Sequence, residues 1–340
     1  MSNSSFLVIG SNSFSGAHFV AGALAAGYRV WGVSRSAESD PVFLPYRWPQ
    51  PATGEPLAGA HNFEFQAIDF NHQLDNLLEL VDRVQPTHVV NFAAQGMVAE
   101  SWLNPTHWYR TNVVSQVALH DALRQRPFLQ KYVHVTTPEV YGSTDAGWIR
   151  EHNHFAPSTP YAVSRAACDL HLHSFHKAYG FPVVFTRAAN VYGPGQQLYR
   201  IIPRAMLSAR TGKPMQLHGS GTSERCFIHI SDAMQATLRL ALEADPGTTW
   251  HLSTREPISI RALVEQICKH CGVTYSTIVE DSGERLGKDQ SYLLDSTSIR
   301  KAFGWNDEVP LVEGLNDTLA WVDHHLDQLQ TLPWNYQHKA

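Results

Sequence analysis

Phe6-Leu-Val-Ile-Gly10-Ser-Asn-Ser13-Phe-Ser-Gly16 is the stretch that decides the fold. Its apolar run predicts a buried strand, and the alanine-rich residues 16–27 predict a helix that a glycine ends. A turn between a strand and a helix needs residues without a Cβ, and the helix N-terminus offers free N–H groups to an anion. The stretch therefore predicts a phosphate-binding turn. An ordinary turn with Ser13 or Ser15 as the helix N-cap remains an alternative.

Strand and helix patterns go on alternating through the first half of the chain. Short apolar runs predict strands at 29–33, 63–68, 89–92, 132–135 and 183–185, and helical spacing predicts helices over 74–84, 113–123 and 161–179. Residues 36–61 carry five prolines and little periodicity, so we expect a loop insertion there. This alternation implies an α/β fold, with a doubly wound parallel sheet covered by helices on both faces.

The regular alternation of strand and helix patterns ends at about residue 194. Helical patterns occupy 200–211, 231–243, 259–270 and 311–329, with short apolar segments between them. We expect a dinucleotide-binding domain over residues 1–194, to which some later segments return, and a smaller C-terminal α/β lobe, mainly for substrate, over 195–330. The lobe should pack against the carboxyl ends of the strands, where ligands bind in open α/β sheets.

Composition narrows the classes of function. The 340 residues are 43% hydrophobic and 17% charged, which excludes wholesale disorder. A net charge of −5 without a basic stripe argues against nucleic acid as a partner. No apolar run approaches the roughly 20 residues that span a bilayer, so we expect no membrane partner and a cytoplasmic protein. Cys268 and Cys271 have the spacing of half a zinc site without a second pair, so we expect no metal.

The end of the second predicted strand bears on the form of the cofactor. Ser34-Arg35 stands where an acidic residue would bind the ribose 2′-hydroxyl of NAD, and a cation suits a 2′-phosphate. We therefore favour NADP, with NAD as the alternative, although Arg35 can also be a solvated loop charge. Asp69, at the end of the third strand, can accept a hydrogen bond from the adenine amino group.

A second set of motifs carries the chemistry. Thr136-Thr-Pro-Glu139-Val-Tyr-Gly142 follows the strand at 132–135, and Pro160-Tyr161-Ala-Val-Ser-Arg165 opens a helix. Tyr161 and Arg165 are four residues apart, so they share a helix face. A cation beside a phenol favours its ionised form, which predicts a base. Glu139 can face the same ligand, or it can cap a loop.

These motifs in this order resemble the extended short-chain dehydrogenase/reductases, and among them the nucleotide-sugar 4,6-dehydratases of the dTDP-glucose, GDP-mannose and CDP-glucose type. The resemblance runs from about residue 6 to 325 and implies a Rossmann-type sheet. Besides the motifs above, it rests on Phe92-Ala-Ala-Gln95, Thr111-Asn112, Asn190-Val-Tyr-Gly-Pro194, Arg225-Cys-Phe-Ile-His-Ile-Ser-Asp232 and Arg285-Leu-Gly-Lys-Asp289.

The resemblance implies a role for each motif residue. The catalytic candidates are Thr137, Glu139, Tyr161 and Arg165. The cofactor-binding candidates are Gly10, Ser13, Phe14, Gly16, Ser34, Arg35, Asp69, Phe70, Ala93 and Ala94, together with Tyr161 and Arg165. The candidates for binding a nucleotide-diphosphate sugar are Gln95, Asn190, Arg200, Arg225 and Arg285, with Lys288 as a further cation; Arg200 can equally be a surface ion pair.

The implied reaction is an internal redox cycle. Tyr161 takes the proton of the sugar 4-hydroxyl while hydride passes from C4 to the nicotinamide, and Thr137 orients that oxygen. Glu139 then removes the C5 proton, the C6 hydroxyl leaves as water, and hydride returns to C6 to give a 4-keto-6-deoxy sugar. Because no cofactor is consumed, we expect it to stay bound between turnovers.

The chain departs from the family pattern at three positions. Ser13 replaces a glycine of the turn, and a serine would be strained there if the position needed a positive φ; its hydroxyl can otherwise donate to the pyrophosphate. Pro138 replaces the acid of the dTDP-glucose type, which the GDP-mannose type also lacks, so Glu139 alone would be both base and acid. Arg165 replaces a lysine, which is not a conservative change at a fitted site.

Three alternatives remain open on the sequence. A nucleotide-sugar epimerase or a UDP-glucuronate decarboxylase of the same superfamily shares most of the motifs. A non-catalytic NADP(H) sensor is also compatible with Pro138 and Arg165. In relatives the helices corresponding to 105–125 and 160–180 pair with a second subunit, so the resemblance further implies a homodimer.

Overall fold

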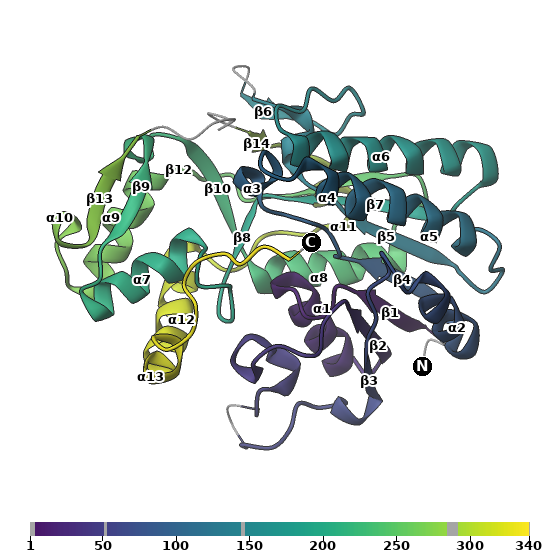
Figure 1. Ribbon diagram of the computed structural model, residues 1–340, viewed down its shortest axis with the longest axis horizontal. Coiled ribbons are helices and arrows are strands. Elements are labelled where there is room, and N and C mark those ends of the chain that lie inside the picture. Colours follow the sequence, from purple (N-terminus) through teal and green to yellow (C-terminus); the bar gives the residue numbers. More distant parts are fainter. Residues whose placement is uncertain (1–3, 51–52, 144–146, 284–291, 340) are drawn as a thin grey trace.

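A seven-stranded parallel sheet forms the centre of the computed structural model, which describes residues 4–50, 53–143, 147–283 and 292–339 (Figure 1). The strand order is β11-β7-β5-β4-β1-β2-β3, and every neighbouring pair is parallel. The strands are β1 Ser5–Ile9, β2 Arg29–Ser34, β3 Phe63–Ala67, β4 His88–Asn91, β5 Lys131–Val135, β7 Val183–Ala188 and β11 Thr249–Leu252. The predicted parallel sheet and its strands are confirmed.

Helices cover both faces of this sheet. Phe6 and Val8 of β1 pack into the core under α1 (Phe14–Ala25) and α8 (Ile230–Glu243), whereas Leu7 and Ile9 pack into the core under the opposite helices. Those helices are α2 Leu74–Val84, α5 Ser115–Leu123 and α6 Pro160–Tyr179. Burial on both faces explains why β1 is apolar throughout instead of alternating. Among the described residues, none of the helices is both long and apolar enough to cross a bilayer.

The connection between β4 and α5 is less regular than the sequence predicts. It contains α3 (Val98–Ser101), α4 (Pro105–Tyr109) and a π-helical turn, η4 (Arg110–Val114). π-Helical turns are rare and occur mostly at functional sites. Here the turn carries Asn112, whose side chain bonds the backbone N–H and C=O of Gln95 and donates to Ser164 Oγ at 2.9 Å. The irregular turn thus ties the loop after β4 to the helix that begins near Tyr161.

The predicted loop insertion at 36–61 is confirmed where the structure describes it. It holds three single-turn helices, η1 Pro41–Phe43, η2 Pro45–Arg47 and η3 Ala60–Asn62, and one isolated bridge between Pro49 and Pro56. Its prolines open the first two of these turns, where a missing N–H costs nothing.

The second half of the chain builds a smaller lobe with its own core. The lobe contains β8 Asn190–Tyr192, β9 Met215–His218, β10 Glu224–His229, β12 Pro257–Ser259 and β13 Val279–Ser282, with α7 Ile201–Thr211, η6 Gly219–Gly221, α9 Ile260–Cys271, α10 Tyr275–Ile278, α12 Leu311–His324 and α13 Leu326–Leu329. In contrast, α8 packs against α1 and β11 pairs with β7, so residues 230–252 return to the large sheet. Three further pieces, η5 Pro138–Tyr141, the pair β6 Trp148–Ile149 and β14 Leu293–Leu294, and α11 Thr297–Phe303, complete the fold.

A buried carboxylate joins α6 to the centre of the sheet. Asp169 on α6 accepts hydrogen bonds from Arg187 on β7 at 2.7 Å and from Thr136 after β5 at 3.0 Å, and its other oxygen lies 3.3 Å from His134 Nε2. Burial by itself would raise the pKa of Asp169, but Arg187 and the His134 hydrogen bond outweigh burial and hold the pKa at about 2. The aspartate is therefore a fixed negative charge inside the protein.

Removing the partner of this charge should destabilise the whole domain. We predict that Arg187→Met lowers the free energy of unfolding by roughly 3–5 kcal/mol, because it leaves the Asp169 carboxylate buried without its cation. Arg239→Met is the matched control, since Arg239 forms a solvent-exposed pair with Glu243 and should cost about 0.3–0.5 kcal/mol. Urea unfolding measures both, and equal losses would contradict the prediction.

Candidate active site

The turn between β1 and α1 depends on close backbone packing. Gly10 has a φ of +87°, and a Cβ there would lie 2.8 Å from the backbone nitrogen of Ala93 on the loop after β4. A Cβ on Gly16 would lie 2.2 Å from the Gly10 carbonyl oxygen. Both positions therefore require glycine. The first N–H groups of α1 are presented at the carboxyl edge of the sheet, as an anion site needs.

Ser13 is not strained in this turn. Its φ is −73°, so the position does not need the left-handed region, and serine replaces glycine without cost. The hydroxyl donates to Gly10 O at 2.7 Å and accepts from Gly16 N at 3.1 Å, which makes Ser13 the N-cap of α1. Since its proton is used inside the turn, the expected donation to a pyrophosphate is not what this arrangement provides.

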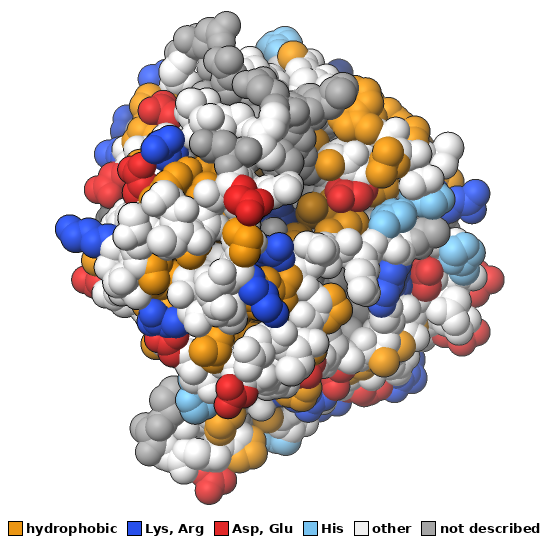
Figure 2. Space-filling view, turned by 60° about the vertical axis from the view of Figure 1, so that its left-hand side comes forward, with side chains coloured by type: hydrophobic (Ala, Val, Ile, Leu, Met, Phe, Trp, Pro, Cys, Tyr) orange, Lys and Arg blue, Asp and Glu red, His pale blue; other side chains and the backbone are white. Residues whose placement is uncertain are grey.

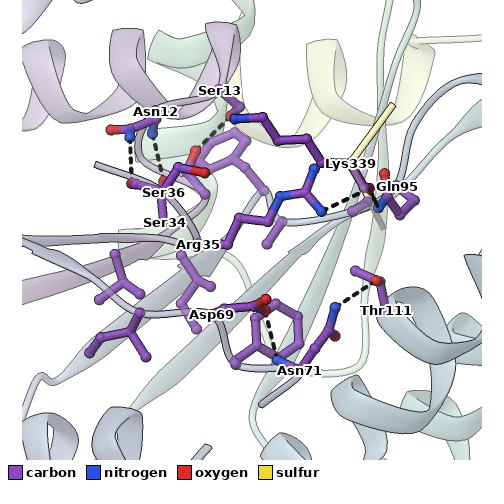
Figure 3. A pocket seen from close by; sticks show the side chains of 18 of the residues that line it. Asn12, Ser13, Ser34, Arg35, Ser36, Asp69, Asn71, Gln95, Thr111 and Lys339 are labelled. Atoms are coloured by element: carbon purple, nitrogen blue, oxygen red, sulfur yellow. Dashed lines mark hydrogen bonds between the residues drawn. The ribbon is translucent and has the colours of Figure 1, made fainter. Parts of the chain in front are cut away.

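A cavity of about 480 Å³ opens beside the turn, at the carboxyl ends of β1 to β4 (Figure 3). Eight of the predicted cofactor residues line it: Gly10, Ser13, Ser34, Arg35, Asp69, Phe70, Ala93 and Ala94. Ser34 Oγ accepts from the backbone N–H of Asn12 at 2.9 Å, so the two sides of the cavity are tied together. A helix N-terminus, a glycine without room for a Cβ and a carboxylate at the far end fit a dinucleotide.

A second cavity, of about 440 Å³, adjoins the first and shares Ser13, Arg35 and Gln95 with it. Its lining brings together all four predicted catalytic residues, Thr137, Glu139, Tyr161 and Arg165, and it includes Phe14. Gly16 lines neither cavity, because it is packed beneath the Gly10 carbonyl. A group that extends from the first cavity into the second would reach the catalytic residues.

The presence of a proline at position 138 has a structural explanation. It is the first residue of η5, where a missing N–H and a fixed φ suit the start of a helix. Thr137 caps this turn by accepting from the backbone N–H of Glu139 at 3.3 Å. The cap aims the threonine hydroxyl and the glutamate side chain into the same cavity. Glu139 is the sole carboxylate among the described residues that line this cavity.

Tyr161 lies in the first turn of α6, which Thr159 caps by accepting from Ala162 N at 3.1 Å. Burial and the nearby Glu139 raise the pKa of the Tyr161 phenol above its ordinary value. Arg165, a hydrogen bond with Thr137 and Arg200 lower the pKa without cancelling that rise. The expectation that the cation would leave the phenol easily ionised is therefore wrong for the protein alone, because burial has the larger effect.

The Arg165 side chain is 2% exposed and reaches under the end of β5. Its Nη2 donates to the Val135 carbonyl and lies 3.5 Å from His134 Nε2, which in turn faces Asp169. Its Nε and Nη1 have no hydrogen-bond partner among the described residues, and Arg165 borders the second cavity. One side of the guanidinium is thus anchored under β5, and the side chain borders the second cavity.

The predicted substrate residues gather in a third cavity of about 980 Å³, lined by Asn190, Arg200 and Arg225. Arg225 lies over the Tyr292 ring at 4.2 Å, and the Tyr292 hydroxyl donates to Asn190 at 3.3 Å. Asn190 and Arg200 also line the second cavity, so the two cavities join. Gln95 lies instead between the first and second cavities. Arg285 and Lys288 lie outside the described residues.

Sequence reasoning missed a contribution from the segment after α13. Trp334 and Tyr336 line the third cavity, and Lys339 lines the first. The signal was present in Leu332, Trp334, Tyr336 and His338, whose alternation is typical of an extended, half-buried segment.

Comparison with known proteins agrees with this geometry. The family model described as GDP-mannose 4,6 dehydratase matches residues 7–318. The chain belongs to this family. A dTDP-glucose 4,6-dehydratase of Streptomyces niveus is 35% identical over 269 residues, which cover 78% of each chain. The family predicted from the motifs is confirmed, and with it the enzyme class, a hydro-lyase that uses a nicotinamide cofactor.

Solved structures share this fold over nearly the whole of both chains. DesIV, the dTDP-glucose 4,6-dehydratase of Streptomyces venezuelae solved with NAD, has a TM-score of 0.84 at 27% identity, over 95% of this chain and 98% of that one. The Bacillus anthracis dTDP-glucose 4,6-dehydratase in complex with NAD has a TM-score of 0.84 at 25% identity, over 96% and 99%. MoeE5 in complex with UDP-glucose and NAD has a TM-score of 0.80 at 27% identity, over 95% and 99%.

The pKa of Tyr161 gives a testable pH dependence. A base with a raised pKa is mostly protonated at neutral pH, so kcat should rise with pH across the neutral range. Arg165 lowers this pKa, and we predict that Arg165→Met reduces kcat and moves the rising limb of the kcat profile to higher pH. Arg165→Lys should keep the limb near its original position, because it retains the charge.

The exposed Arg83 of α2, paired with Glu64 on the edge strand β3, supplies the control Arg83→Met. Its pH profile should match the unmodified enzyme. An unshifted limb in Arg165→Met would show that the guanidinium does not act on the phenol.

Proposed function

We propose that this chain converts a nucleoside-diphosphate hexose into the 4-keto-6-deoxy sugar by removing water across C5 and C6. The observation that carries the proposal is the convergence of Thr137, Glu139 and Tyr161 on one cavity beside the dinucleotide site. Tyr161 meets the need for a proton acceptor at the 4-hydroxyl, and Glu139 meets the need for a carboxylate at C5. The dTDP-glucose 4,6-dehydratases named above support the same reaction class.

Each side chain has a task that its position allows. Tyr161, bonded to Thr137, accepts the proton of the sugar 4-hydroxyl; when bound, the nicotinamide accepts a hydride and returns it. Glu139 takes the C5 proton, which the 4-ketone acidifies, and gives it to the departing C6 hydroxyl, because Pro138 has no proton to give. As hydride returns to C6, C5 takes up a proton and Tyr161 gives up the proton that it accepted from the 4-hydroxyl, so that the protons balance. General acid–base groups of this kind contribute typically 10²–10⁴-fold each.

The third cavity is proposed to hold the nucleoside diphosphate. Arg200 and Arg225 bring cations to its wall, and arginine binds phosphate well through paired N–H groups. Figure 2 shows Lys and Arg side chains gathered near the middle of this face, beside hydrophobic ones. We assign residues 195–330, apart from those that return to the large sheet, to substrate binding.

We propose NADP as the preferred cofactor, with Arg35 as the residue that meets the 2′-phosphate. Ser34 ends β2 and Arg35 follows it in the wall of the first cavity, so no carboxylate occupies the end of that strand. The structures of relatives solved with NAD support NAD as the alternative cofactor. Arg35→Ala should weaken the binding of NADP more than that of NAD if the proposal holds.

A homodimer is proposed from the surface of the helices before and after β5. Trp102, Leu103, Val114 and Leu170 are 44%, 77%, 65% and 49% exposed, which is unusual for large apolar side chains. They belong to α3, η4 and α6 or to the loops beside them, and these elements pack against one another. A second copy would cover this surface.

The reaction is tested by incubating the protein with dTDP-, GDP-, CDP- and UDP-hexoses without added cofactor. We expect one of them to lose the mass of one water. Release of CO₂ from a uronic acid would indicate a decarboxylase, an epimer of unchanged mass would indicate an epimerase, and no change in any substrate would favour a sensor. Heat-released cofactor, identified by mass, distinguishes NADP from NAD.

Glu139→Gln separates the steps of the proposed reaction. It should oxidise C4 but dehydrate at least about 10²-fold more slowly, so reduced cofactor accumulates and is seen by its absorbance. Glu79→Gln, on the exposed face of α2, is the control and should turn over normally. Normal dehydration by Glu139→Gln would remove the carboxylate from the mechanism.

The oligomer is tested by light scattering. We predict that the unmodified chain has the mass of a dimer and that Leu103→Glu and Val114→Glu together give a monomer. Val312→Glu, at an exposed apolar site on α12 outside this surface, should leave the dimer intact. A monomeric unmodified protein at micromolar concentration would contradict the proposal.

A further inference from the structure

The segment 332–339 leaves α13 and crosses the carboxyl edge of the large sheet (Figure 1). Its side chains alternate: Leu332, Trp334, Tyr336 and His338 are half-buried, and the residues between them are exposed. Trp334 fixes the first part, because its Nε1 donates to Leu329 O at 3.0 Å and its carbonyl accepts from Arg204 at 3.0 Å. Arg204 and Lys213 also lie over its indole ring.

The far part of the segment is held by the large domain. The imidazole of His338 stacks on the fully buried Trp108, at 5.0 Å and 12°, and bonds His107 at 2.8 Å. Burial and the neighbouring His107 lower the pKa of His338, which favours the neutral form of the His338 ring. Tyr336, between the two anchors, packs on Tyr199 in the wall of the third cavity. The segment therefore bridges the two lobes.

Lys339 ends the bridge directly over the dinucleotide site. Its backbone carbonyl accepts from Gln95 Nε2 at 2.8 Å and from Arg35 Nη1 at 3.1 Å, on opposite walls of the first cavity. Figure 3 shows its side chain extending across this cavity toward Ser13, the N-cap of α1. The ammonium group is thus directed at the N-terminal end of a helix.

This orientation is unfavourable for a cation by itself. The N-terminus of a helix carries a partial positive charge, which repels an ammonium group and attracts an anion. An anion lying between the turn and Lys339 would bind both the N–H groups at the start of α1 and the Lys339 ammonium. A segment that occupied the site in place of a cofactor would instead bring acceptors to the N–H groups of α1. The Lys339 ammonium and the N-terminus of α1 are both positive. They therefore suit a dinucleotide phosphate between them, and the lysine does not take the place of that phosphate.

We propose that residues 332–339 form a clasp that closes over the bound dinucleotide, with the Lys339 ammonium paired to its phosphates. The inference rests on the dinucleotide site of the proposed function and adds a residue that the family match, which ends at residue 318, does not include. A cofactor that is regenerated in each turnover need not leave, so a clasp that slows its release keeps the enzyme loaded.

The test is the rate at which NAD⁺ or NADP⁺ leaves the loaded protein, followed by tryptophan fluorescence after dilution. Lys339→Ala should release the cofactor roughly five-fold faster, the scale of one partly exposed charged contact, and Lys339→Glu faster still. The difference should shrink at high salt. His338→Ala, which loosens the anchor on Trp108, should also speed release. Lys301→Ala, an exposed lysine of α11 with the same change in charge, is the control.

Proteolysis provides an independent test of whether the segment closes over the cofactor. If the clasp closes over the cofactor, saturating NAD⁺ should slow chymotrypsin cleavage after Tyr336; if the cofactor displaces the segment, cleavage should speed up, which would overturn the proposal. Equal release rates for Lys339→Ala and the unmodified protein would overturn it too. Failure of the unmodified protein to bind either dinucleotide would instead contradict the proposed function.

Discussion

The site depends on the buried carboxylate of Asp169. This group binds Arg187 of β7, Thr136 after β5 and, through His134, the strand β5 itself, so α6 cannot move relative to the strands that end at the site. Tyr161 lies two turns before it on the same helix, and Thr137 follows Thr136 directly. A charge that is expensive to bury is stable here because its cation and hydrogen bonds are buried with it. The geometry of phenol and threonine therefore follows from an ion pair that touches neither.

The same network explains how an arginine occupies a position where relatives have a lysine. The guanidinium is longer than an ammonium and needs several partners. Val135 O and the His134 ring contact one of its nitrogens, which holds the group under β5 while the side chain borders the second cavity. The charge stays close enough to lower the pKa of Tyr161, although burial still dominates. The substitution thus changes the strength of an electrostatic effect and leaves its direction unchanged.

Three cavities meet at the carboxyl edge of the sheet, and the segment 332–339 passes along all three. Gln95 lies at the junction of the first two, held by the π-helical turn through Asn112 and bonded to the Lys339 carbonyl. The proposed cofactor site, the proposed substrate site and residues 332–339 are therefore arranged around one short loop after β4. This places residues from the two extremes of the sequence, Ser13 and Lys339, on the same cavity.

The sequence by itself determined most strands and helices of the large sheet and the class of the chemistry. Doubly buried strands such as β1 are continuous apolar runs, and Tyr161 and Arg165 lie on one helix face by their spacing, so local patterns suffice for both. Tertiary structure alone decided three matters. Ser13 has a negative φ, so serine fits the turn without strain, and the raised pKa of Tyr161 follows from burial outweighing a neighbouring cation. The return of residues 332–339 to the site depends on stacking with Trp108, a partner more than two hundred positions away, which no local pattern specifies.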